Sequence, residues 1–180
     1  TSMNMGSLNK LALSAQEALQ QTLTVASDAQ SSQAEPIHML KALLVSQENN
    51  LSAIIKRIGA DPHQLLANVN DEISRMPKVS GAGGMMGVPG PALMGVIDRA
   101  VKIAEKLGDS YATTEHLLIA LSEDKNAAGR ILNGAGVTRK TVEAAYEELR
   151  GDTRVTDQAN KTQFEALEQY GQNLTQRARE

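Results

Sequence analysis

The chain has 180 residues, 18 of them Lys or Arg and 21 Asp or Glu, and a formal net charge of −3. Its cations are scattered and only 2% of its residues are aromatic, which argues against a nucleic-acid-binding protein, because such proteins cluster cations or stack bases on aromatic rings. The absence of cysteine excludes disulfides and thiolate chemistry, and no apolar run approaches the roughly 20 residues of a membrane span.

The first segment, residues 1–7, contains no basic stretch followed by a hydrophobic one. It therefore does not resemble a secretory signal. We expect a flexible lead here. We also expect a cytoplasmic protein, since a chain without cysteine suits a reducing compartment.

Residues 8–77 should form a first repeat of four helices. Apolar residues recur at three- and four-residue spacing in the first of them, which predicts a helix with one buried face. Pro36 suits a first helical turn, Gly59 suits a helix end, and Asp61 suits an N-cap. The predicted helices span 8–29, 36–46, 51–58 and a stretch from Pro62 to just before Pro77.

Residues 78–91 should be a linker, because the twelve residues 80–91 include five glycines and two prolines. The stretch has no Gly-Lys-Ser/Thr sequence entering a helix, so it does not predict a phosphate-binding loop. A second repeat follows over 92–151. Its predicted helices span 92–107, 114–122, 126–134 and 138–149.

Residues 152–180 should connect this unit to something else. The segment is polar at first and then carries Phe164, Leu167, Tyr170 and Leu174 at helical spacing. A helix with so few apolar residues is marginal alone and needs a neighbour. We therefore expect a connector to a module that lies beyond this chain.

The two halves repeat one another. Pro-Ile-His-Met-Leu-Lys-Ala-Leu at 36–43 returns as Thr-Glu-His-Leu-Leu-Ile-Ala-Leu at 114–121, 78 positions further on. What repeats is mostly apolar and helix-forming, which favours a binding or scaffolding module over an active site. The sequence therefore predicts an all-α fold, a tandem pseudo-twofold repeat of two four-helix units with about eight helices.

His38 and His116 are the first candidates for chemistry, since imidazole binds metals and transfers protons. Each lies in the first turn of a predicted helix among apolar residues, and only Glu115 stands beside them as an acidic ligand. We interpret both histidines as structural and predict no metal site.

Asp109 and Glu115 flank a loop rich in Ser and Thr, so they could cap helices or act as acid and base. Nothing marks a nucleophile, and we predict no catalytic residue.

The order and spacing of four features carry a family resemblance. They are the duplicated unit, its His-Leu-Leu-x-Ala-Leu element, Arg75-Met76-Pro77 followed by Gly81-Ala82-Gly83-Gly84, and the exit sequence Leu-Glu-Gln-Tyr-Gly-Gln-Asn-Leu-Thr at 167–175. From about Leu8 to Glu180 the chain resembles the N-terminal domain of the Clp-family AAA+ ATPases, most closely that of the bacterial disaggregases. In that family the exit leads into the first AAA+ module. The resemblance thus implies no cofactor in this chain, with ATP and Mg expected only in AAA+ modules beyond it.

The resemblance implies a non-catalytic domain of a stress-response chaperone. Such a domain binds unfolded or aggregated polypeptide in an apolar groove between the repeats and passes it to the AAA+ hexamer. Carried over position by position, the client-binding residues are Leu11, Ile97, Ile103, Asp109, Tyr111 and Glu115. The sequence departs from the family pattern at Ala12, where threonine is usual, and at Arg99 and His116, which are apolar in some relatives.

The resemblance also implies partners. They are client proteins, the protein's own AAA+ module in a hexamer, and a DnaK-type chaperone acting with the full-length protein. We expect no nucleic acid, no membrane and a monomeric fragment. An adaptor-docking domain is the alternative function, and a self-standing enzyme is a third for which the sequence offers no motif.

Overall fold

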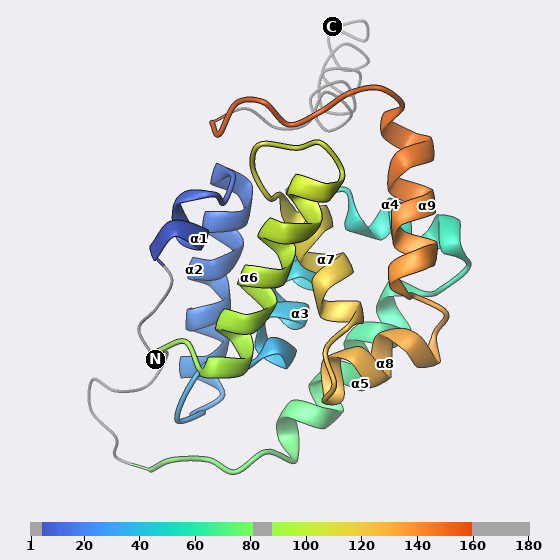
Figure 1. Cartoon of the computed structure of the whole chain (residues 1–180). Coiled ribbons are helices and arrows are strands. Elements are labelled where there is room, and N and C mark those ends of the chain that lie inside the picture. The colour runs from blue at the N-terminus through green and yellow to red at the C-terminus, as the bar shows by residue number, and fades with distance from the viewer. Residues whose placement is uncertain (1–4, 81–87, 160–180) are drawn as a thin grey trace, which may run out of the picture.

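Nine α-helices and no β-strand make up the part of the chain that the computed structural model describes, residues 5–80 and 88–159 (Figure 1). The all-α class predicted from the sequence is confirmed. The helices are α1 (Met5–Asn9), α2 (Leu13–Asp28), α3 (Pro36–Val45), α4 (Leu51–Ile58), α5 (Pro62–Ser74), α6 (Pro91–Lys106), α7 (Thr114–Ser122), α8 (Ala127–Gly134) and α9 (Arg139–Arg150).

The single helix predicted over 8–29 is instead two helices, α1 and α2. Between them Leu11 forms a parallel bridge with Ala112. Ala12 N–H donates to Ala112 O at 2.8 Å, and Ala112 N–H donates to Lys10 O at 2.9 Å. These main-chain groups bond to a distant loop and so cannot also continue a helical ladder.

The remaining eight helices, α2 to α9, correspond to the eight predicted ones. α1 begins at Met5, inside the segment expected to be a flexible lead. Half of the predicted linker over 78–91, namely residues 81–87, lies outside the described residues, as does the predicted connector helix within 160–180.

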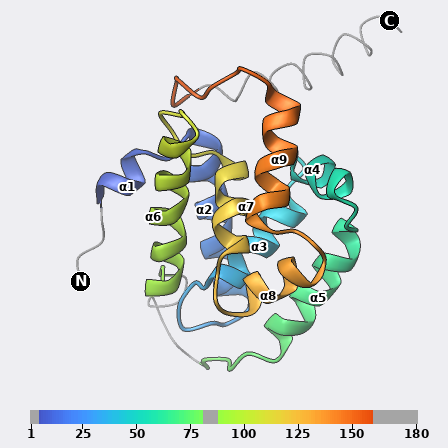
Figure 2. The same cartoon turned by 45° about the vertical axis from the view of Figure 1, so that its right-hand side comes forward.

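The central helices are α3 and α7. Every residue of α7 is buried, as is most of α3. The two pack against each other and against helices of both repeats. In Figures 1 and 2, α2 and α6 lie on one side of this pair, and α4, α5, α8 and α9 lie on the other. One aliphatic core, with buried side chains from both repeats, therefore serves the whole fold.

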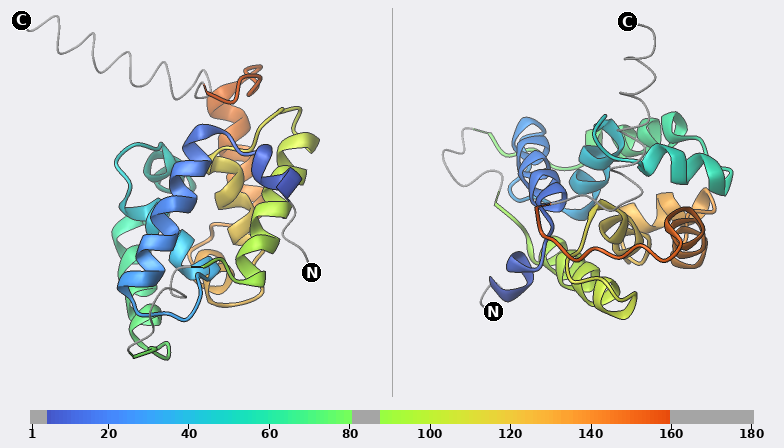
Figure 3. Two further views of the ribbon diagram at one scale, coloured as in Figure 1. Left: turned by 90° about the vertical axis from the view of Figure 1, so that its left-hand side faces the viewer. Right: turned by 90° about the horizontal axis from the view of Figure 1, so that it is seen from above.

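Two isolated backbone bridges join the repeats. Leu11 pairs with Ala112, and Ala34 pairs with Pro89, both in parallel orientation. Leu11 and Pro89 stand 78 positions apart, as do Ala34 and Ala112. Each repeat thus pairs the residue two positions before its first long helix with the residue two positions before the other repeat's central helix. This reciprocal exchange is the signature of a twofold axis, and it confirms the predicted pseudo-twofold arrangement, which Figure 3 views from the side and from above.

Candidate binding site

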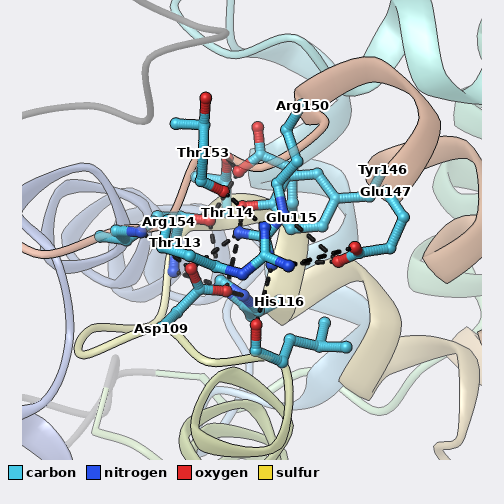
Figure 4. Close-up of polar contacts among 12 residues, drawn as sticks. Asp109, Thr113, Thr114, Glu115, His116, Tyr146, Glu147, Arg150, Thr153 and Arg154 are labelled. Carbon is cyan, nitrogen blue, oxygen red and sulfur yellow. Dashed lines mark hydrogen bonds and ion pairs between the residues drawn. The ribbon is translucent and has the colours of Figure 1, made fainter.

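A cluster of buried polar side chains lies where α7, α9 and the loop between α6 and α7 meet (Figure 4). We call it the polar cluster. Each member is at most 4% exposed, so each needs hydrogen-bond partners within the protein. The members are Asp109, Thr113, Glu115, His116, Tyr146 and Arg150.

Asp109 is the centre of the polar cluster. Its two carboxylate oxygens lie 2.7 and 2.8 Å from Nη1 of Arg150. Nε2 of His116 donates to Oδ2 at 2.8 Å, and the main-chain N–H of Val155 donates to Oδ1 at 2.8 Å. Burial favours the neutral acid, but these donors outweigh it and hold the pKa of Asp109 below its usual range. One carboxylate thereby ties together α7, α9 and the segment after α9.

His116 connects Asp109 to the start of α7. Its Nδ1 accepts the main-chain N–H of Thr113 at 2.9 Å, so its Nε2 carries the proton donated to Asp109. The imidazole meets the ring of Tyr146 edge-on, with 5.4 Å between centroids. The guanidinium of Arg150 lies 4.3 Å from the centre of the same ring, a cation–π contact. Burial raises the pKa of Tyr146, so its hydroxyl stays neutral.

Glu115 completes the polar cluster. Its Oε2 accepts the hydroxyl of Thr113 at 2.6 Å and that of Thr114 at 3.4 Å. Its Oε1 has no hydrogen-bond partner among the described residues. A carboxylate in a first helical turn is favoured by the helix dipole. The N-cap of α7 is Thr113, so neither Asp109 nor Glu115 caps this helix.

The first repeat has no equivalent cluster. At the positions 78 residues earlier, Ser31 stands for Asp109 and Ile37 stands for Glu115. Only the histidine is kept, as His38. The polar cluster is therefore a property of the second repeat and not of the duplicated plan.

His38 lacks the carboxylate partner that His116 has. Its Nδ1 accepts the main-chain N–H of Glu35 at 2.8 Å, as His116 does with Thr113. Its buried Nε2 has no partner among the described residues. Burial first, and then the charge of Lys41, lower the pKa of His38 to about 4.

The segment after α9 lies across the seam between the repeats. We call residues 155–158 the strap. Ser110 N–H donates to Val155 O at 2.7 Å, and Leu13 N–H donates to Gln158 O at 2.9 Å. Figure 1 shows the strap running from the end of α9 back above the loop between α6 and α7. The strap therefore bonds to the second repeat at one end and to the first repeat at the other.

A shallow groove of about 690 Å³ lies between the strap and the start of α2. We call it the seam groove. The first repeat contributes Leu13 and Gln16, and the second contributes Tyr111, while residues 156–159 form one side. Leu13 is 46% exposed, so the seam groove presents apolar surface to the outside at the junction of the two repeats.

The structure places the six predicted client-binding residues unevenly. Tyr111 lines the seam groove. The other five are at most 4% exposed: Leu11, Ile97, Ile103, Asp109 and Glu115. Asp109 and Glu115 belong to the polar cluster, and the two isoleucines lie on the buried face of α6. Contact of these residues with a client stays a prediction.

Sequence reasoning missed Tyr146 and Arg150, which complete the polar cluster. A signal was present in their spacing. Val142, Tyr146 and Arg150 stand four residues apart, and α9 buries all three. Arginine is rarely buried without a partner of opposite charge, so its place on this stripe pointed to a buried acid elsewhere in the fold.

Among the described residues no group of three or more His, Cys, Asp or Glu side chains is arranged to hold a metal ion. None of the helices within 5–80 and 88–159 is long and apolar enough to cross a membrane.

Known proteins resemble this chain in sequence. Residues 10–135 match the family model described as the Clp repeat (R) N-terminal domain. The chain is 38% identical over 151 residues to the chaperone protein ClpB of Propionibacterium freudenreichii and 38% identical over 149 residues to that of Rhodopseudomonas palustris. Each alignment covers 82% of this chain but only 17% of the relative. The chain thus spans less than a fifth of the curated relatives that it matches.

Solved structures resemble it in fold. The Hsp104 N-terminal domain from Candida albicans has a TM-score of 0.72 and 26% identity, over 83% of this chain and 97% of that one. The N-terminal domain of the ClpV1 ATPase from E. coli has a TM-score of 0.67 and 17% identity, over 88% of this chain and 94% of that one. At the lower identity the likeness shows the fold alone.

Proposed function

Because the chain belongs to the Clp repeat N-terminal domain family, we propose that it is the client-recognition domain of a ClpB-like chaperone. It binds exposed apolar segments of unfolded or aggregated polypeptide and passes them to an AAA+ hexamer. Its contribution is binding, and ATP with Mg belongs to the AAA+ modules. A cytoplasmic setting and cooperation with a DnaK-type chaperone are parts of the same proposal.

The seam groove is the observation that carries this proposal. Leu13, Tyr111 and Ala159 give it apolar surface, and the polar side chains of Gln16, Thr156, Asp157 and Gln158 complete its lining. A surface of this kind suits weak, promiscuous contact, because several side-chain shapes can lie on it without a matching pocket. Weak contact also favours release towards the next module.

The buried predicted residues take a supporting part in this proposal. The polar cluster, through Asp109 and Glu115, fixes the loop that presents Tyr111 to the seam groove. Leu11, Ile97 and Ile103 form the apolar interior beneath that surface. Because these three side chains are buried, they contact a client only when the two repeats separate along the seam.

An NMR titration of this chain with a permanently unfolded, mildly basic polypeptide tests the proposal. We expect saturable shifts of the amide signals of Leu13, Gln16 and Tyr111. Tyr111→Ala should weaken binding about three- to tenfold, because the loss of aromatic contact area costs roughly 1 kcal/mol. Val88→Ala is the matched control, since Val88 is also exposed and apolar but does not line the seam groove.

The outcomes separate the candidate functions. Equal loss of affinity in both variants would point to nonspecific adhesion. Absence of any shift at millimolar polypeptide would overturn client capture and favour the adaptor-docking alternative, which a titration with a folded adaptor protein then tests.

A further inference from the structure

A second groove lies on the first repeat, between α2 and the end of α3. We call it the α2–α3 groove, and its volume is about 560 Å³. Ala42 of α3 is buried within it, and Val25 and Val45 supply apolar surface. Its remaining lining residues are polar or acidic: Gln20, Gln21, Thr24, Ser46, Gln47 and Glu48. The groove lies on one repeat only, apart from the seam groove, whose lining residues it does not share.

The second repeat fills the corresponding place with its own side chain. Arg99 of α6 donates from Nη1 to the main-chain oxygen of Ala120 in α7, at 3.3 Å. Arg99 stands 78 positions after Gln21, and Ala120 stands 78 positions after Ala42. The pseudo-twofold relation therefore matches the α2–α3 groove to a site where a guanidinium already bonds to a main-chain carbonyl in the last turn of a helix.

The electrostatics of the α2–α3 groove suit a cation. α3 ends at Val45, and the carbonyl end of a helix carries the negative end of its dipole. The carboxylate of Glu48 lies on the rim and makes no ion pair among the described residues. None of the described residues that line the groove is Lys or Arg. The first repeat thus keeps the acceptors but lacks the cation that the second repeat supplies.

We infer that the α2–α3 groove binds an arginine side chain presented by a partner polypeptide. The inference rests on the proposed function and adds a chemical preference to it: clients dock an arginine beside the apolar segment that the seam groove holds. Arginine fits better than lysine for two reasons. Its planar guanidinium can donate to a helix carbonyl and to the carboxylate of Glu48 together, and its aliphatic stem can pack on Val25 and Val45.

Three short peptides test the inference, each with glycine and serine around one central residue. The centres are arginine, lysine and citrulline, the last being the neutral isostere of arginine. In an NMR titration we expect saturable shifts at Gln21, Ala42 and Glu48 with the arginine peptide. Citrulline should bind at least about tenfold more weakly, since hydrogen bonds that involve a charged group are stronger than those between neutral groups.

Two substitutions exchange the properties of the two repeats. Gln21→Arg places in the first repeat the side chain that fills the second, so it should abolish binding of the arginine peptide. Gln21 is exposed on α2, and arginine is a good helix former, so the variant should fold. Gln21→Met is the control of similar length, and it should retain binding. Glu48→Gln should weaken binding about three- to tenfold, as expected for loss of one charged partner.

The results of these titrations test the arginine site and the proposed function separately. Equal binding of the arginine and citrulline peptides, or undiminished binding to Gln21→Arg, would overturn the inference. The proposed function is scored separately with an unfolded polypeptide that contains no arginine. If that polypeptide still shifts Leu13 and Tyr111 while the arginine peptide does nothing, the arginine site fails and client capture stands.

Discussion

At the scale of single residues, His38 and His116 occupy equivalent places but differ in what their second nitrogen meets. His116 donates from Nε2 to Asp109, whereas the same atom of His38 is buried without a partner among the described residues. A buried donor that lost its hydrogen bonds to water carries a free-energy cost. Protonation would occur at Nδ1 and would place a positive charge on this buried ring, near Lys41, while displacing the hydrogen bond from Glu35 N–H, which explains why the pKa of His38 is low.

The first prediction concerns acid stability. The folded-state pKa of His38 is about 4, below the value of 6.5 for an unperturbed histidine. The unfolded chain therefore binds a proton that the folded chain resists, and the free energy of unfolding should fall as pH drops from about 6.5 to about 4. The loss from this group should reach up to about 3 kcal/mol.

Urea denaturation at a series of pH values measures this fall in the free energy of unfolding. His38→Gln is the reference variant, because it lacks the titrating group while keeping polarity at the site. Its stability should change less than that of the parent over the same pH interval. Parallel curves for the two proteins would show that His38 does not resist protonation.

At the scale of elements, the polar cluster joins α7 and α9 to the loop between α6 and α7. Arg150 alone bonds to Asp109, Tyr146, Glu147 and the carbonyl of Leu107. In the first repeat, allowing for the slip of one residue near its third helix, Ile73 stands for Arg150. The two repeats therefore fill equivalent positions differently: the first repeat uses an apolar side chain, and the second uses a buried ion pair.

The next prediction follows from that comparison. Asp109→Asn should cost about 3–5 kcal/mol of stability, because it leaves the guanidinium of Arg150 buried without its counter-charge. Arg150→Met should cost a similar amount by stranding Asp109. The double variant should lose clearly less than the sum of the two, since no buried charge is left alone.

Urea unfolding of the four proteins gives the coupling energy of the pair. Additive losses would mean that the two side chains do not depend on each other. Charge reversal at Asp109 should likewise unfold the protein, because it would place a second cation against the buried guanidinium of Arg150. Binding tests therefore belong on Tyr111.

Sequence patterns predicted the elements well where a pattern is local. Pro36, Asp61 and the repeated His-Leu-Leu-x-Ala-Leu element mark helices that the structure contains. The break between α1 and α2 is different. Leu11 fits the helical spacing of its neighbours, but the main-chain groups on either side of it, Lys10 O and Ala12 N–H, bond to Ala112, about a hundred positions away in the sequence. No local signal records such a bond.

The polar cluster likewise could be predicted only in part from local sequence patterns. Asp109 and Glu115 were singled out from the sequence, but their burial was not predicted. Asp109 stands in a polar loop and Glu115 in the first turn of a helix, two places where a carboxylate is usually exposed. Burial is decided by α9, which brings Tyr146 and Arg150 over them. Partners from separate elements become visible only when the helices are packed.

At the scale of the whole molecule, the strap connects the end of the described chain to its beginning. The side chain of Gln158 donates to the main-chain oxygens of Asn9 and Leu11, at 3.0 and 2.9 Å. Because the strap forms one side of the seam groove, its attachment governs the shape of that groove.

Removing this attachment gives the last prediction. Gln158→Ala should speed hydrogen exchange of the Leu13 amide roughly ten- to thirtyfold, since it removes two hydrogen bonds, each of the order of 1 kcal/mol, that hold the strap in place. Asp152→Asn, an exposed change just before the strap, should leave that rate unchanged. Amide hydrogen exchange measured by NMR distinguishes the two variants. Equal rates in all three proteins would show that the side chain of Gln158 does not hold the strap.

The reciprocal bridges between Leu11 and Ala112 and between Ala34 and Pro89 also limit how this architecture can grow. Solenoid repeats leave a free face at each end, so further copies can be added in a row. Here each copy satisfies the other's pairing segment, and the exchange closes on itself like the interface of an isologous dimer. A third copy would find neither segment vacant.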